Sequence, residues 1–215
     1  MRHHEHDVRS GRSRLWWFRV RAVLAGGLVL GIGSAATVAA WNDGEYATAT
    51  ITAGTFQIEG STSSATTGYS DHAASTSAAV LPFAPVVTAA TPGTTTYASF
   101  WVRTKSTSVA GTVALQTPTF GTASTGLQSS LTYGVRLLGP SETCGSTAFS
   151  TPLGTTIVTA GTALGGTLAA PSPTIAAASG AVHQYCFAIT LPTTAPNTAQ
   201  GLVAAPNWQF LATAS

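Results

Sequence analysis

From Ala40 to the end of the chain, short runs of Val, Ile, Thr and aromatic residues are separated by clusters of Gly, Pro and Ser. Such runs are typical of β-strands bounded by turns. No window of about 12 residues in this part combines apolar residues at helical spacing with charged residues opposite them. We therefore predict strands over residues 48–58, 79–87, 95–104, 111–118, 131–138, 155–159, 182–191 and 207–213.

Alternation along these runs predicts which side chains face the core, because successive side chains in a strand point to opposite faces. In 95–104, one face carries Tyr97, Ser99, Trp101, Arg103 and Lys105, and the other carries Ala98, Phe100, Val102 and Thr104. The predicted core face of 182–191 carries Tyr185, Phe187, Ile189 and Leu191, and one face of 207–213 carries Trp208, Phe210 and Ala212. The parity of the first run changes at Gly54, which predicts a bulge or bend.

About eight short strands with turns between them favour an all-β fold, a two-sheet sandwich of jelly-roll or Ig-like type. The many threonines suit outward strand faces, since threonine is β-branched and polar. Residues 60–77 are rich in Ser, Thr and Ala, and residues 161–180 contain two prolines; both are predicted loops. Neither has the character of a domain boundary, so we expect residues 40–215 to form a single domain.

Residues 1–39 have the three parts of a secretory signal peptide. A basic n-region covers 1–21, an apolar h-region 22–32 and a small-residue c-region 33–39. The predicted cut lies between Ala39 and Ala40, with Thr37 at the third position before it; a cut between Ala40 and Trp41 is the alternative. Residues 22–41 also reach the length of about 20 residues that a membrane anchor needs, but their glycines and the lack of a following basic cluster favour the signal.

Charge excludes one class of partner. Only 7% of the residues are charged, and six of the nine basic residues precede residue 22. The rest of the chain has five carboxylates against three cations, so a basic nucleic-acid footprint is missing and we expect no nucleic-acid partner. The cluster His3-His4-Glu5-His6-Asp7 has metal-ligand residue types, but it precedes the signal and would be discarded on cleavage. We predict no metal site.

Cys144 and Cys186 are the two cysteines of the chain. An exported protein with an even number of cysteines usually pairs them, so a disulfide is the first interpretation and two buried thiols are the alternative. Two cysteines without a nearby histidine pair do not make a structural zinc site.

The sequence lacks the motifs of familiar enzymes. There is no H-E-x-x-H, no Walker sequence and no G-x-S-x-G after a strand. Ser70-Asp71-His72 has the residue types of a catalytic triad, but adjacent residues do not provide its geometry by themselves. We therefore predict no catalytic residue and no cofactor. Trp101, Arg103 and Lys105 are a candidate surface patch for a sugar or an anion, against the simpler interpretation of a solvated strand face.

The junction Thr37-Val38-Ala39-Ala40-Trp41-Asn42-Asp43, followed by Ala53-Gly54-Thr55-Phe56-Gln57-Ile58, resembles the N-terminal region of the TasA/camelysin family of biofilm-matrix and spore-coat-associated proteins. The shorter motifs 99–104, 131–136, 185–187 and 208–210 resemble actinobacterial members. The resemblance is most specific over residues 22–60.

The resemblance implies a secreted or cell-surface jelly-roll subunit whose signal is removed by a SipW-type signal peptidase. It further implies that subunits join by donor-strand exchange, with themselves or with other matrix subunits. The donor would be residues 40–53, including Trp41, Tyr46, Thr48 and Ile51, and the membrane would be met only through an uncleaved signal. A surface adhesion or carbohydrate-binding module is the alternative function. A camelysin-like metalloprotease is disfavoured, because the chain lacks a zinc-protease motif.

Overall fold

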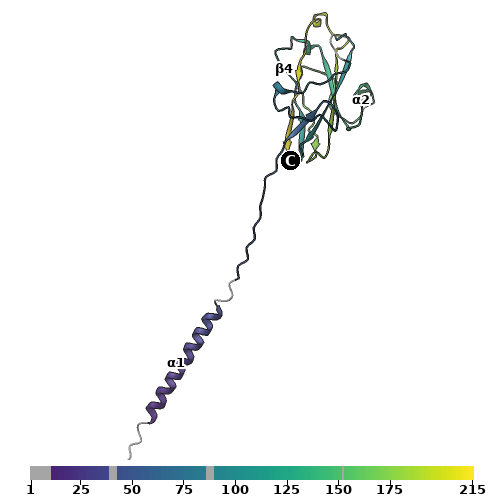
Figure 1. Cartoon of the computed structure of the whole chain (residues 1–215). Coiled ribbons are helices and arrows are strands. Elements are labelled where there is room, and N and C mark those ends of the chain that lie inside the picture. Colours follow the sequence, from purple (N-terminus) through teal and green to yellow (C-terminus); the bar gives the residue numbers. More distant parts are fainter. Residues whose placement is uncertain (1–10, 39–42, 86–89, 152) are drawn as a thin grey trace, which may run out of the picture. The chain divides into compact units, whose positions relative to one another are not determined.

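The computed structural model describes residues 11–38, 43–85, 90–151 and 153–215 (Figure 1). Two compact units are present, Met1–Ile51 and Thr52–Ser215. The first contains helix α1 (Gly11–Val38). Within the described part of the chain, no helix combines the length and the apolar character required to cross a membrane. Thr37 lies in α1, whereas Ala39, Ala40 and Trp41 lie outside the described residues.

The second unit is an all-β fold built from antiparallel sheets. The larger sheet has five strands in the order β1-β2-β8-β5-β6. These strands are β1 (Ile58–Ser61), β2 (Thr95–Thr104), β8 (His183–Thr190), β5 (Thr132–Leu138) and β6 (Thr155–Ala163). Strand β8 lies at the centre and pairs over its length with both β2 and β5.

Two smaller sheets complete the unit. One has the order β10-β3-β7, formed by β10 (Phe210–Ala214), β3 (Gly111–Leu115) and β7 (Thr174–Ile175). The other pairs β4 (Thr119–Phe120) with β9 (Pro206–Asn207). The amide of Gln116 donates to the carbonyl of Gln209 at 2.9 Å, so the β4–β9 pair continues the β3–β10 pair. The short helices are α2 (Ser146–Ser150) and the 3₁₀ turns Ser75–Ser77, Leu127–Ser129 and Asn197–Ala199.

The main core takes side chains from the large sheet and from the β10-β3-β7 sheet. Strand β2 alternates without exception between half-buried and buried residues, which confirms the predicted faces. Tyr185, Phe187 and Leu191 are buried and Ile189 packs against them, so the predicted core face of β8 is also confirmed. The buried members of this core are Phe100, Val102, Val113, Leu115, Leu131, Tyr133, Val135, Ile157, Val158, Leu164, Ile175, Tyr185, Phe187 and Leu191.

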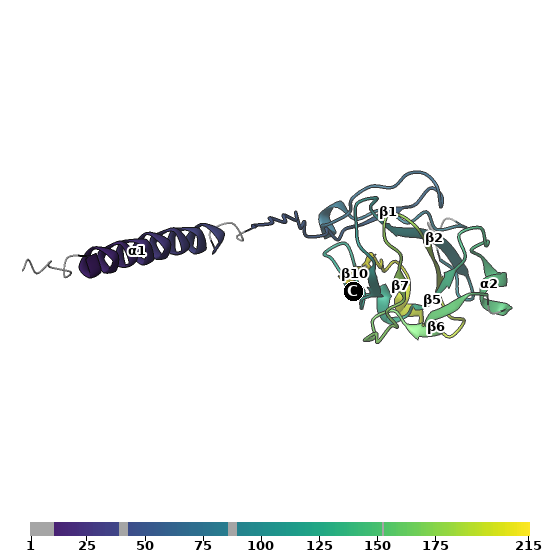
Figure 2. The ribbon, with the colours of Figure 1, turned by 90° about the horizontal axis from the view of Figure 1, so that it is seen from below.

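The opposite face of β8 is buried as well. Cys186 is fully buried and packs in a second cluster with Leu138 and Ala148 of α2. In Figure 2, α2 lies on the outer side of the large sheet, away from β10 and β7. The central strand is therefore covered on both faces, which explains why its interior residues from Gln184 to Ala188 are all buried.

Two predicted strands are wrong. In 48–58 only Ile58 belongs to a strand; Thr55 makes an isolated bridge to Ser108. In 79–87 the described residues form no strand, because Pro82 and Pro85 have no amide hydrogen to donate to a ladder. No bulge or bend is assigned at Gly54, where one is predicted, and the residue lies outside any strand. A glycine suits the close packing there, because a Cβ would lie 2.6 Å from Val109 Cγ1.

Most residues of the two predicted loops lie outside strands, but each predicted range also includes residues that belong to strands. Residues 60–77 begin inside β1, and residues 161–180 contain the end of β6 and all of β7. Strands β4 and β7, each two residues long, and helix α2, a single turn, lie outside the predicted elements. Elements this short depend on their tertiary partners and leave no periodicity in the sequence.

Candidate functional site

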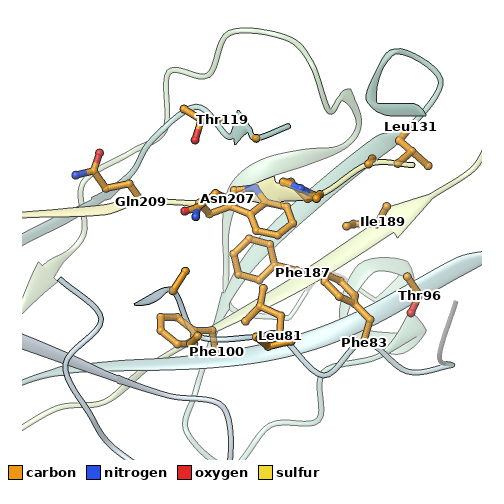
Figure 3. A pocket seen from close by; sticks show the side chains of 18 of the residues that line it. Leu81, Phe83, Thr96, Phe100, Thr119, Leu131, Phe187, Ile189, Asn207 and Gln209 are labelled. Carbon is orange, nitrogen blue, oxygen red and sulfur yellow. The ribbon is translucent and has the colours of Figure 1, made fainter. Parts of the chain in front are cut away.

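A largely apolar cleft is present in the β-rich unit. Its volume is about 1890 Å³. The floor is the core face of β2 and β8, and the walls are segment 71–83 on one side and residues 195–210, including β9, on the other. Figure 3 shows the Phe187 side chain between Asn207 on one wall and Leu81 and Phe83 on the other.

Five aromatic side chains line this cleft: Phe83, Phe100, Phe187, Trp208 and Phe210. Their rings are in contact across elements distant in sequence. The centroids of Phe187 and Trp208 are 4.8 Å apart, those of Phe100 and Phe210 5.3 Å, and those of Phe83 and Trp208 6.4 Å. Phe100 and Phe187 are buried in the core, whereas Phe83, Trp208 and Phe210 are half-buried and offer apolar surface to whatever enters. The charged lining residues, Glu59, Asp71 and Lys105, gather at one end of the cleft.

Residues 79–83 form one wall of the cleft without being a strand. Ala79, Leu81 and Phe83 are half-buried and pack against the core, while Val80 and Pro82 are exposed. The backbone is tied to β2 only at the end of the segment, where Ala84 and Tyr97 exchange hydrogen bonds of 2.8 and 2.9 Å. The wall is therefore held mainly by its side chains.

The loop before this wall brings together two of the residues in the Ser70-Asp71-His72 motif. Ser70 Oγ lies 3.0 Å from His72 Nε2, and His72 Nδ1 lies 3.0 Å from the carbonyl oxygen of Ser77. This arrangement orients a histidine beside a hydroxyl. The Ser70 amide, however, already donates to the carbonyl of Gly60, so it cannot stabilise an oxyanion at Ser70. These hydrogen bonds of His72 instead stabilise the conformation of the loop.

The charged members of the predicted patch are paired within the chain. Arg103 Nε donates to Glu59 Oε1 at 2.7 Å, and Lys105 Nζ donates to Asp71 Oδ2 at 2.6 Å. The Arg103 guanidinium also lies over the ring of Tyr69; burial raises the pKa of this tyrosine, and the positive charge of Arg103 acts in the opposite direction. Trp101 is half-buried beside them on the same face of β2. The patch therefore fastens segment 59–71 to β2.

The candidate donor segment lies outside the sheets. Among its described residues, 43–53, there is no strand. The side chains of Tyr46 and Ile51 are 99% and 93% exposed, and Thr48 is also exposed. An extended segment with apolar side chains and an unpaired backbone is suited to pairing with another strand edge.

The predicted disulfide is present. Cys144 and Cys186 are bonded, with their Cα atoms 5.3 Å apart, which is within the usual range. The bond fastens the segment that carries α2 to the outer face of β8. Such a bond is consistent with an extracellular location.

The sequence did not predict the cleft itself. Its lining comes from segments that are more than a hundred residues apart. The one local signal is the alternation in 208–210, since residues 79–83 are all apolar in the sequence. In the described ranges, no group of three or more His, Cys, Asp or Glu side chains is placed to hold a metal ion. Comparison with models of known protein families and with curated protein sequences finds no match to this chain.

Proposed function

We propose that this protein is an exported structural subunit that assembles with copies of itself by β-strand addition, as part of an extracellular matrix fibre or surface layer. The observation that carries the proposal is the pairing of features in one chain: an apolar cleft lined by aromatic side chains, and an exposed N-terminal segment that forms no strand among its described residues. The architecture we propose is a two-sheet sandwich of jelly-roll type in which the cleft is the acceptor of a neighbour's strand.

The donor is residues 40–53 of a second copy. As a strand, this segment would place Ala47, Ala49 and Ile51 on one face and Tyr46, Thr48, Thr50 and Thr52 on the other. The small apolar face suits entry between aromatic rings, and the threonine face suits solvent. Eleven residues from Asp43 to Ala53 would extend about 36 Å, long enough to reach out of one subunit into the next.

Export precedes assembly in this proposal. Removal of residues 1–39 by a signal peptidase of the SipW type would leave Ala40 as the new N-terminus and free the donor. N-terminal sequencing of the protein recovered outside cells is expected to begin at Ala40, or at Trp41 for the alternative cut. Recovery of the protein in membranes with Met1 intact would instead indicate an anchor.

Complementary variants test strand addition directly. Ile51→Asp is expected to disable the donor, and Thr50→Asp, on the other face, is the matched control that still assembles. Ala204→Trp is expected to fill the cleft, because Ala204 lines it and packs against the core. Each disabled variant alone should remain monomeric in sedimentation velocity and electron microscopy.

A mixture of the two disabled variants is the decisive sample. The Ala204→Trp protein retains a donor and the Ile51→Asp protein retains an acceptor, so together they should form dimers that grow no further. If the unmodified protein stays monomeric under all assembly conditions, or if Thr50→Asp is as defective as Ile51→Asp, strand addition by this face is wrong.

A further inference from the structure

We propose that residues 79–83 are an internal plug of the cleft, seated in the isolated subunit and displaced when the donor segment of a second copy enters. This inference rests on the proposed function and concerns how access to the acceptor site is controlled. Its occupant is this chain's own segment in one state and a second copy's residues 43–53 in the other.

The side chains of the plug occupy a strand-like place in the cleft. Ala79, Leu81 and Phe83 pack against the core, and Val80, between them, borders the cavity but is 87% exposed. This is the alternation of a β-strand with one buried face. Phe83 reaches Trp208 on the opposite wall, with ring centroids 6.4 Å apart. The plug therefore covers apolar surface that would otherwise meet water.

The backbone of the plug does not complete the fold. Pro82 has no amide hydrogen, and the amide of Phe83 donates locally to the carbonyl of Leu81 at 3.0 Å. The paired hydrogen bonds with Tyr97 begin only at Ala84. The side chains of the plug are packed as those of a strand would be, but its backbone does not form the regular hydrogen bonds of a strand. The neighbouring backbone groups therefore stay available to a segment that can form those hydrogen bonds.

The donor segment can form the backbone hydrogen bonds that the plug cannot form. Ala47, Ala49 and Ile51 repeat the spacing of Ala79, Leu81 and Phe83, and residues 43–53 contain no proline. When the donor replaces the plug, the cleft would lose contact with the larger apolar side chains of the plug. In return, the donor would form a continuous set of backbone hydrogen bonds. The two segments are alternative occupants of one site, so the affinity for the donor is reduced by the population of the plugged state.

Just after the plug, Thr96 Oγ1 donates to the carbonyl of Pro85 at 2.7 Å in a half-buried hydrogen bond. Before the plug, the attachments are few and exposed. The loop before it is folded by the contacts of His72 with Ser70 and Ser77. Asn207 Nδ2 donates to the carbonyl of Ser75 at 3.2 Å. The hydrogen bonds before the plug are all at exposed positions and contribute little each.

Binding of a labelled peptide tests the plug. The probe is a fluorescein-labelled peptide of residues 43–53, added to the full chain carrying Ile51→Asp so that its own donor is disabled. Adding Leu81→Ala should weaken the plug and tighten peptide binding about tenfold. Val80→Ala, an exposed position in the same segment, is the matched control and should change the Kd by less than about twofold. Equal Kd values for the Leu81→Ala and Val80→Ala proteins would overturn the plug.

Hydrogen exchange gives a second readout that does not depend on a core substitution. Saturating peptide should speed exchange at the amides of Leu81, Phe83 and Ala84, above all at Ala84, whose bond to Tyr97 would open. Peptide that binds while these amides keep or gain protection would overturn the plug and leave strand addition standing. Peptide that binds none of these proteins would overturn both the plug and the proposed function.

Discussion

The guanidinium carbon of Arg103 lies 3.7 Å from the centroid of the Tyr69 ring, while Nε of the same side chain donates to Glu59. One side chain of β2 thus holds both β1 and the segment that follows it. Strand β1 is four residues long and stands at the edge of the large sheet. A short edge strand of this kind needs side-chain contacts to stay in register.

Arg103→Gln is expected to lower the free energy of unfolding by about 1–2 kcal/mol, the sum of a cation–π contact and a partly buried ion pair. Lys105→Gln is the matched control and should cost less than about 1 kcal/mol, because its partner Asp71 has a side chain 58% exposed. Urea unfolding of both variants measures the difference. Equal losses would show that the contact with Tyr69 contributes nothing.

Replacing both cysteines by alanine should lower the free energy of unfolding by about 4 kcal/mol. The bond closes a loop with a sequence separation of 42, and in the chain-entropy model a loop of this length gives that magnitude. Chemical denaturation with and without a reductant measures it. Reduction of the unmodified protein should reproduce the loss, and the double variant should not respond to the reductant. A loss below about 1 kcal/mol would contradict the expectation.

His183 should make the fold sensitive to mild acid. Burial lowers the pKa of its imidazole below the ordinary value of 6.5, against a smaller opposite effect of a hydrogen bond with the Thr174 backbone. A histidine with a lowered folded-state pKa contributes stability that is present above 6.5 and is lost as the pH falls through the folded pKa.

The free energy of unfolding should therefore decline as the pH falls below 6.5, and His183→Gln should flatten that part of the profile. Urea titrations at several pH values between 5 and 7.5 measure both proteins. The same substitution at His72 is the control and should leave the contribution of His183 in place. Parallel profiles for the unmodified and His183→Gln proteins would contradict the prediction.

Gly154→Ala should destabilise the hairpin between β5 and β6 by at least about 2 kcal/mol. Gly154 has φ +58, and an added Cβ would overlap the carbonyl oxygen of Leu137. Its own carbonyl accepts a hydrogen bond from Arg136 at 3.0 Å. Gly121→Ala is the matched control, since its Cβ would meet no atom within 4 Å, and thermal unfolding should find it within about 0.5 kcal/mol of the parent.

The most regular strands could be predicted closely from the sequence. The bounds 95–104 match β2 in full, because ten alternating residues with aromatic and β-branched side chains fit a half-buried strand and little else. The core face of β8 followed from the same reasoning. The disulfide could be predicted because a chain expected to be exported usually pairs an even number of cysteines.

The errors have a common physical origin. Residues 79–83 are all apolar, so the sequence predicts a buried strand there without showing which side chains face inward. A strand also needs backbone groups that can pair, and Pro82 has no amide hydrogen to donate. Residues 48–54 have β-forming side chains, but they pair with no strand among the residues that the structure describes. A five-residue helix such as α2 is stabilised by packing against Leu138 and Cys186 rather than by its sequence.

Because the side chain of Cys186 points away from those of Tyr185 and Phe187, the disulfide cluster and the cleft occupy opposite faces of one sheet. Pro140 and Ser141 are exposed on a turn just before Cys144. A fluorophore or affinity tag inserted there would be separated from the cleft by the thickness of the sheet. A label at this turn would therefore leave the cleft free, and it could follow the assembly that we propose through a surface on the opposite side of the sheet.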